Sequence, residues 1–322
     1  MDRAGPRTAA LGLGLAAVVT VAGAFAATGA PLRALRWLSP DADPVAVLGS
    51  TPTECLPPAP PDAETAYRIE VGRAAFRSPL LLGGQAARAG LACESCHREG
   101  RTNPDFQFPG VSGPPGTADV TSSLFSRRRG DGIDNPRPIP DLSGPPAALK
   151  VSRAAEGGAL EGFIHGLVVD EFDGAEPPPA VLDGLATYVR ALSPAACPKD
   201  ARRPLRAADL VEDARRAART GLAAQARGDT ATAVVMVQAA RGRLGLVFER
   251  YDGPDLARQR AVLLAADRDL ADVLARLREG DPRAADRLRA WLDRSNAWSR
   301  EVTAAESRSL FDPRRLAALA RG

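Results

Sequence analysis

Histidine and methionine are scarce in this chain of 322 residues, which contains two of each. The histidines are His97 and His165, and the methionines are Met1 and Met236. Two histidines are too few for a multi-histidine metal site or a histidine-rich chain of redox centres, and the four cysteines make only one Cys-x-x-Cys pair, whereas a zinc ribbon needs two. Chemistry that needs imidazole or thioether ligands is therefore confined to a few positions.

Lysine and aromatic residues are also rare. Lys150 and Lys199 are the only lysines, so arginines make up 40 of the 42 basic residues, and aromatic residues account for 5% of the chain. Against 39 acidic residues the net charge is +3, a balance that argues against a protein dedicated to binding nucleic acid. A hydrophobic fraction of 45% excludes a disordered chain and leaves room for two modest domains.

Residues 1–33 have the pattern of an export signal. Arg3 and Arg7 precede an uncharged stretch at residues 8–32, which is rich in alanine, leucine, valine and glycine. Two outcomes stay open: cleavage after Ala26, or retention of residues 8–32 as an anchor in the inner membrane. In both cases the rest of the chain is expected in the periplasm or another extracytoplasmic space, where disulfides form.

The rest of the sequence predicts an all-α protein. Residues 39–64 are rich in proline, aspartate and alanine without a sustained period, and we expect an extended lead-in there. Residues 65–198 are expected to form a first domain. Within it, residues 100–146 are rich in glycine and proline, and because loops of this length are uncommon in compact domains we expect this one to wrap around another part of the structure. Helical patterns in this domain lie at residues 65–89, 159–169 and 179–192.

Residues 206–322 predict an arginine-rich antiparallel bundle of four main helices. Asp229 is a typical helix cap, and Asp281-Pro282 and Asp312-Pro313 are typical helix starts. From residue 201 on, 24 arginines and 17 acidic residues give a net charge of +7, so the earlier part of the chain carries −4. Leucines recur at every seventh position and predict an apolar stripe on one helix; they are Leu256, Leu263, Leu270 and Leu277.

One five-residue segment carries the chemistry, Cys93-Glu-Ser-Cys96-His97. Two cysteines three residues apart on a helical turn can each bond to a vinyl group of haem, and the next histidine can then ligate the iron. A redox dithiol would need a preceding strand and a βαβ unit, and a zinc site would need two more ligands, none of which is visible. The motif therefore predicts one covalently attached haem c per chain, with His97 as an axial ligand.

The chain resembles the c-type cytochromes at this point, and specifically the haem domains of bacterial cytochrome c peroxidase-like proteins. The matching segments are Gly72-x-x-x-Phe76, Gly90 to Gly100 around the motif, Pro138-Ile-Pro-Asp-Leu142 and Leu182-x-x-Leu185-x-x-Tyr188-x-x-x-Leu192. The resemblance implies that the helix before the motif crosses the last helix of the domain, with Gly72 and Phe76 packing against Tyr188. It covers residues 65–192 and does not reach the bundle.

The chain departs from that family in having a single haem motif, whereas the peroxidase-like proteins generally carry two haems. A two-haem cycle within one chain is therefore excluded. The second axial ligand stays open, because residues 65–192 contain no methionine. His165 is the candidate, with a histidine packed in the core as the alternative, and Met236 is expected in the core of the bundle.

Two further features belong to the first domain. Arg127, Arg128 and Arg129 are candidates for contacts with the haem propionates, and the alternative is a solvated surface run. Cys55 and Cys197 flank the domain in proline-rich turns, and in an oxidising compartment we expect them to form a disulfide.

The favoured function is that of an exported single-haem electron carrier whose bundle docks a redox partner. The alternatives are an open-site haem enzyme of peroxidase type and a haem-based sensor or scaffold. In the open-site enzyme Asp170 and Glu171 would move protons, and otherwise they are expected to be exposed turn residues. The positive charge of the bundle suggests contact with the acidic first domain, with an acidic partner protein or with anionic membrane head groups. No nucleic-acid partner is expected.

Overall fold

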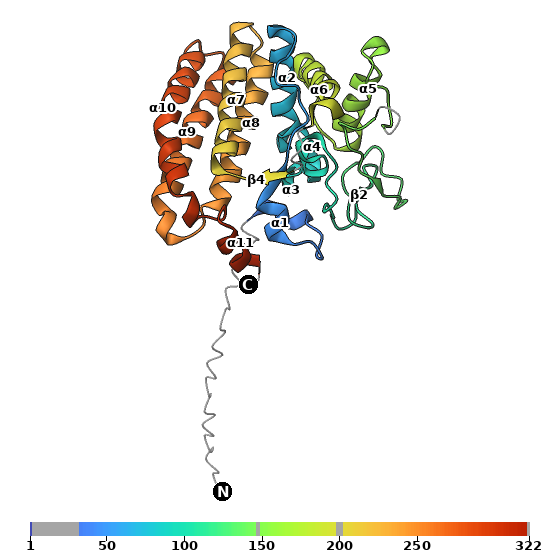
Figure 1. The fold of residues 1–322 in the computed structure, drawn as a ribbon, viewed down its shortest axis with the longest axis horizontal. Coiled ribbons are helices and arrows are strands. Elements are labelled where there is room, and N and C mark those ends of the chain that lie inside the picture. Colours follow the sequence, from blue (N-terminus) through green and yellow to red (C-terminus); the bar gives the residue numbers. More distant parts are fainter. Residues whose placement is uncertain (2–31, 146–148, 198–201, 321–322) are drawn as a thin grey trace.

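The computed structural model describes Met1 and residues 32–145, 149–197 and 202–320 (Figure 1). The predicted export signal falls mainly on residues 2–31, outside the described residues. At the end of that segment Leu32 is buried, and Arg33 begins the 3-10 helix η1 (Arg33–Trp37). Cleavage after Ala26 would leave both residues in the mature protein.

Helices make up about 60% of the structure and strands about 4%, which confirms the predicted all-α class. In the described ranges the strands form two short antiparallel pairs. The pairs are β1 (Ser50–Pro52) with β4 (Arg202–Pro204), and β2 (Thr117–Ala118) with β3 (Arg137–Pro138).

Two long helices, α2 (Ala63–Phe76) and α6 (Pro179–Ala191), frame the first domain. The side chain of Asp62 caps α2 by accepting a hydrogen bond from the backbone N–H of Thr65 at 2.8 Å. Pro179 occupies the first turn of α6, where its missing N–H costs nothing. The shorter helical segments are η2 (Pro79–Leu81), α3 (Gly84–Ala89), α4 (Cys93–Cys96), η3 (Arg98–Gly100), η5 (Glu156–Gly158), α5 (Ala159–Gly166), η6 (Leu167–Glu171) and η7 (Pro194–Ala196).

The crossing of α2 and α6 confirms the predicted packing of Phe76 on Tyr188, whereas Gly72 meets the backbone of Gly184. A Cβ atom on Gly72 would lie 1.9 Å from the carbonyl oxygen of Gly184, so the two backbones touch where neither residue has a side chain. The rings of Phe76 and Tyr188 pack with their centroids 5.2 Å apart. Only glycine fits at this crossing.

Part of the expected extended lead-in is helical. Helix α1 (Pro44–Leu48) follows Asp43, whose side chain accepts a hydrogen bond from the N–H of Val45 at 2.9 Å. Its apolar side chains pack with residues near the C-terminal end of the chain, and the local spacing of apolar residues does not predict such a contact. The buried residues of this cluster are Leu32, Val47, Leu48, Leu310 and Leu316.

The long loop over residues 100–146 covers the apolar core of the first domain, as its length suggested. Phe106, Val111, Phe125 and Ile139 are buried in a cluster that also contains residues of α2 and α6. The loop is therefore folded onto the core through its few large apolar residues.

Four long helices follow Arg206 in the part of the chain that the structure describes. They are α7 (Ala207–Ala226), α8 (Thr230–Arg250), α9 (Ala257–Glu279) and α10 (Ala284–Ala304). The short helix η8 (Pro254–Leu256) joins α8 to α9, and η9 (Glu306–Arg308) and α11 (Pro313–Ala320) follow α10. Consecutive helices pack side by side, and α10 also packs on α7 (Figure 1). Asp229 caps α8 as predicted, and the four leucines of the predicted stripe are buried.

The first domain packs directly on these helices through α2, which contacts both α7 and α8. Met236 of α8 is fully buried and belongs to the apolar cluster of the first domain. Ion pairs cross the same boundary, with Arg216 3.9 Å from Glu70 and Arg227 3.3 Å from Glu64. Contact between the basic and acidic parts, one of the three possibilities suggested by the charges, is thus present.

Helix α8 also has the length and composition of a membrane-spanning helix, alone among the described residues. Half of its apolar window is buried inside the protein. A core helix packed on both sides, as α8 is between α7 and α9, has the same composition.

The predicted disulfide between Cys55 and Cys197 is confirmed. It ties the lead-in to the end of the first domain across a sequence separation of 142 residues. In the chain-entropy model, closing a loop of that length adds about 5 kcal/mol to the free energy of unfolding.

Candidate functional site

The haem motif lies on a short, well-fixed segment between α3 and the long loop. Gly90 ends α3 with φ of +80°, a left-handed conformation that glycine adopts without strain. The chain then enters α4, where the Oγ of Ser95 accepts a hydrogen bond from the N–H of Ala92 at 3.1 Å. A helix thus precedes the motif, in place of the strand that a thioredoxin-like site would need.

Cys93 and Cys96 are unpaired thiols that pack against the apolar core of the first domain. Burial raises the pKa of both thiols to about 12. Both side chains are partly exposed, and in the described ranges they belong to no group of three or more possible metal ligands.

The imidazole of His97 is oriented by a backbone carbonyl. Its Nδ1 lies 3.0 Å from the carbonyl oxygen of Pro140, and because a carbonyl only accepts, Nδ1 carries the proton. Burial lowers the pKa of His97 to about 4, so the ring is neutral at neutral pH. The lone pair of Nε2 is then available, which is the form of histidine that binds a metal ion.

These residues fit a covalently bound haem. The described ranges contain no group of three or more His, Cys, Asp or Glu side chains placed to hold a bare metal ion. Haem needs no such group, because the porphyrin supplies the equatorial ligands and the protein supplies axial ones. Partly buried apolar side chains that would shield a porphyrin pack on the same core; they are Leu142, Val151, Ile164, Val169 and Phe172.

His165 lies at the end of α5, and its side chain is 37% exposed. Its Nε2 is 2.8 Å from a carboxylate oxygen of Glu176. Ligation of iron through Nε2 would require this contact to open. The role of second axial ligand therefore stays a prediction for His165.

The arginine run lies at the surface. Arg127 pairs with Asp173 at 2.7 Å, and Arg128 and Arg129 lie 3.3 Å and 3.6 Å from Asp170. All three guanidinium groups are exposed and engaged by the acidic turn that follows α5. This arrangement matches the surface-run alternative, and a contact with haem propionates stays a prediction.

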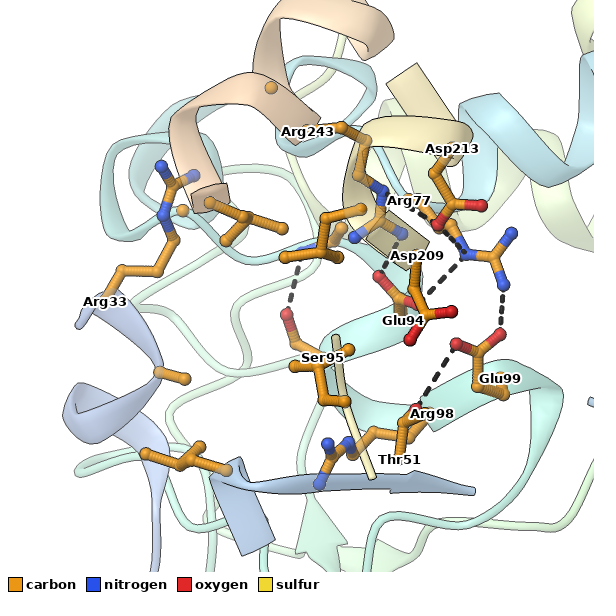
Figure 2. A pocket seen from close by; sticks show the side chains of 18 of the residues that line it. Arg33, Thr51, Arg77, Glu94, Ser95, Arg98, Glu99, Asp209, Asp213 and Arg243 are labelled. Carbon is orange, nitrogen blue, oxygen red and sulfur yellow. Dashed lines mark hydrogen bonds and ion pairs between the residues drawn. The ribbon is translucent and has the colours of Figure 1, made fainter. Parts of the chain in front are cut away.

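A cavity of about 250 Å³ is lined both by the segment that carries Cys93 to His97 and by the C-terminal helices (Figure 2). Glu94 and Ser95 of α4 line one side, and Asp213 of α7 and Arg243 of α8 line the other. Since Cys93 and Cys96 pack on the apolar core, α4 separates an apolar region from a strongly charged one.

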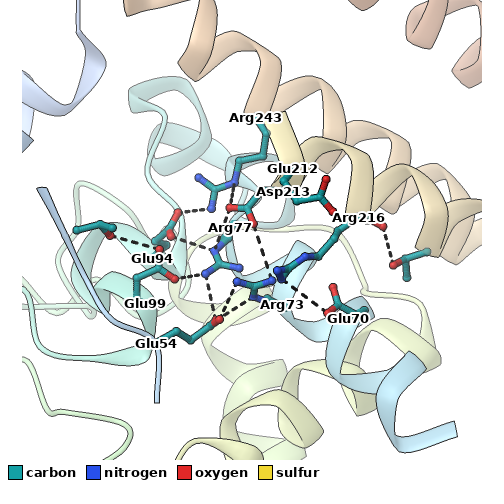
Figure 3. A network of polar contacts seen from close by, with 12 residues as sticks. Glu54, Glu70, Arg73, Arg77, Glu94, Glu99, Glu212, Asp213, Arg216 and Arg243 are labelled. Carbon is teal, nitrogen blue, oxygen red and sulfur yellow. Dashed lines mark hydrogen bonds and ion pairs between the residues drawn. The ribbon is translucent and has the colours of Figure 1, made fainter. Parts of the chain in front are cut away.

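Partly buried carboxylates surround Arg77 at the end of α2, and the side chain of Arg77 is 4% exposed (Figure 3). Its guanidinium group lies 3.1 Å from Glu54 and 3.0 Å from Glu94, and it also contacts Glu99. The hydroxyl of Tyr188 donates to Glu54 at 2.8 Å. Sequence reasoning identified none of these charges as buried, because one arginine among 40 gives no local signal of its environment.

Comparisons with protein-family models, curated proteins and solved structures find no match for this chain. The function is therefore argued from the residues of the site.

Proposed function

We propose that the protein is an exported c-type cytochrome with a single covalent haem, which carries electrons to or from a redox partner. The main support is the geometry of His97, whose contact with Pro140 leaves Nε2 available, one residue after Cys96, the second of two partly buried, unpaired thiols. Haem bound there would supply reversible one-electron chemistry.

The chain's residues would hold this group in three ways. Cys93 and Cys96 would anchor it through thioether bonds, and His97 would ligate the iron from a ring whose rotation is restricted by Pro140. The apolar side chains of the core on which Cys93 and Cys96 pack would help to exclude water, which is one of the factors that set a haem reduction potential.

A single haem motif limits the chain to one electron at a time. The two remaining cysteines are joined in the Cys55–Cys197 disulfide, which ties down the ends of the first domain. Reduction of a two-electron oxidant would need a second source of electrons, so a partner protein is required in either case. Electron transfer is the function that needs the fewest redox centres beyond the single proposed haem.

One observation favours an open-site enzyme as the second candidate. Glu171 is almost buried in the π-helical turn η6, and its Oε2 has no hydrogen-bond partner among the described residues. Burial raises the pKa of Glu171, although Arg129 at 3.7 Å opposes the shift. A carboxyl group of this kind can give and take a proton closer to neutral pH than an exposed one. For a sensor or scaffold no such observation exists in the described residues.

Absorption spectra of the holoprotein separate the candidates. A low-spin spectrum that carbon monoxide and cyanide leave unchanged supports the electron carrier. A high-spin spectrum that shifts with either ligand supports the open-site enzyme. A protein that acquires no haem in a host with the cytochrome c maturation system contradicts both.

A further inference from the structure

The residue between the two haem cysteines is held from two directions. One carboxylate oxygen of Glu94 accepts a hydrogen bond from Nε of Arg77 at 3.0 Å, and the other accepts from Nη2 of Arg243 at 2.5 Å (Figure 3). Arg77 belongs to the end of α2, whereas Arg243 belongs to α8, 149 residues away from Glu94 in the sequence. The C-terminal helices therefore touch the haem motif itself.

Both arginines of this contact are buried, and the side chain of Glu94 between them is 20% exposed. The side chain of Arg243 is 5% exposed and that of Arg77 is 4% exposed. A guanidinium group removed from water is costly unless a carboxylate compensates its charge. Glu94 supplies that compensation to both arginines, so its position is fixed by two strong interactions that solvent screens poorly.

Asp213 of α7 extends the arrangement into the bundle. Its carboxylate lies 3.7 Å from Nε of Arg243 and 3.9 Å from Nε of Arg77. Two helices of the bundle thus contribute charges to the wall behind α4. A rigid pair of helices that supplies both an arginine and its counter-ion holds the motif more firmly than a mobile loop would.

We infer that Arg243 is a positioning residue of the proposed haem site: through Glu94 it holds helix α4 in place, and it puts a fixed positive charge on the side of α4 that lines the cavity. This inference rests on the proposed covalent haem and assigns the C-terminal helices a role in the site, in addition to any role in docking. A buried positive charge near haem favours the ferrous form, and a buried negative charge favours the ferric form.

A double-mutant cycle on the holoprotein tests the inference through the reduction potential. Arg243→Met removes the positive charge and should lower the potential, whereas Glu94→Gln removes the negative charge and should raise it. The double variant should return towards the wild-type value. Each single shift is expected to reach up to about tenfold in the reduction equilibrium, which is ~59 mV for one electron.

Arg294→Met is the matched control, because Arg294 pairs with Asp269 on the exposed face of the bundle. It should leave the potential unchanged. The inference is overturned if Arg243→Met behaves like this control, or if both single variants shift the potential in the same direction. A wild-type protein without haem would instead refute the proposed function.

Amide hydrogen exchange provides a second measurement that does not depend on redox chemistry. In Arg243→Lys, which keeps the charge but loses the planar guanidinium group, amides of residues 93–97 should exchange faster than in the wild type while the potential stays close to it. Should Arg243→Met fail to fold, this variant together with Glu94→Gln decides the matter. Unchanged exchange at residues 93–97 would contradict the positioning role of Arg243.

Discussion

Glu94 and His97 lie three residues apart and have opposite surroundings. Glu94 is an ionised carboxylate between two guanidinium groups, whereas His97 is a neutral imidazole held by the carbonyl of Pro140. Burial alone would raise the pKa of Glu94, but Arg243 and Arg77 outweigh it and hold that pKa below its ordinary value. The middle positions of the motif are therefore not interchangeable spacers in this protein.

His165 provides a test at the level of a single residue. If the protein is a carrier with two histidine ligands, His165→Ala should convert a low-spin haem into a high-spin one that binds cyanide, because an axial position has opened. The visible spectrum before and after addition of cyanide measures this. A spectrum that is identical in the variant and the wild type would remove His165 from the iron and favour the open-site enzyme, since Nε2 would then keep its contact with Glu176.

Among the helices, the crossing of α2 and α6 depends on two residues without side chains. The sequence indicated Gly72, Phe76 and Tyr188 as the contact but not Gly184, although Gly184 provides the backbone that Gly72 touches. The crossing matters for the site because the ring of Phe76 lies with its centroid 6.4 Å from that of His97.

We expect Gly72→Ala to destabilise the protein by about 1–3 kcal/mol, because the new methyl group would overlap the carbonyl oxygen of Gly184 and backbone cannot move aside cheaply. Urea unfolding of the purified protein measures the change. Gly242→Ala in α8 is the control: its Cβ would meet no atom within 4 Å, and alanine should stabilise the helix by up to about 1 kcal/mol. Equal effects of the two substitutions would contradict the close crossing.

The elements differ in how far the sequence predicts them. Asp229 marks the start of α8 correctly, because a helix cap acts within three residues. Helix α1 was missed, because its stability comes from apolar residues at the opposite end of the chain. The charges around Glu94 were missed for the same reason, since Arg243 lies 149 residues away. Local sequence patterns indicate helix caps and the spacing of apolar residues. Contacts between residues far apart in the sequence leave no such local pattern.

At the scale of the whole molecule, part of the positive charge of the bundle is neutralised by ion pairs within the protein. Arg216, Arg227 and Arg243 all pair with acidic residues of α2 or α4. Removal of the chain after residue 198 would expose Arg77 and the apolar face of α2 as well as docking surfaces. Loss of partner binding in such a truncation would therefore not by itself show that the bundle is a docking module.

The contact between the first domain and the bundle at Asp213 should contribute less to stability at acidic pH. Burial would raise the pKa of Asp213, but Arg77, Arg243 and Arg73 outweigh it and hold that pKa below its ordinary value of 3.8. A group whose pKa is lower in the folded state stabilises the protein above its unfolded pKa, and the contribution is lost as pH falls through the folded pKa. Asp213→Asn should thus cost about 1–3 kcal/mol at pH 7 and progressively less below the ordinary carboxyl pKa.

Urea unfolding at several pH values measures this difference. Asp286→Asn is the control, because Asp286 forms an exposed pair with Arg289 that should contribute little at any pH. A cost of Asp213→Asn that stays constant between neutral and acidic pH would mean that its carboxylate is not the acid-sensitive group.

Covalent attachment of haem is the central claim, and the intact mass of the denatured protein tests it most directly. Produced in a host with the cytochrome c maturation system, the chain should carry the mass of one haem through acid-acetone extraction. The variant with Cys93→Ala and Cys96→Ala should lack that mass while keeping the Cys55–Cys197 disulfide. A wild-type mass equal to that of the bare polypeptide, with both Cys93 and Cys96 open to alkylation, would contradict the account.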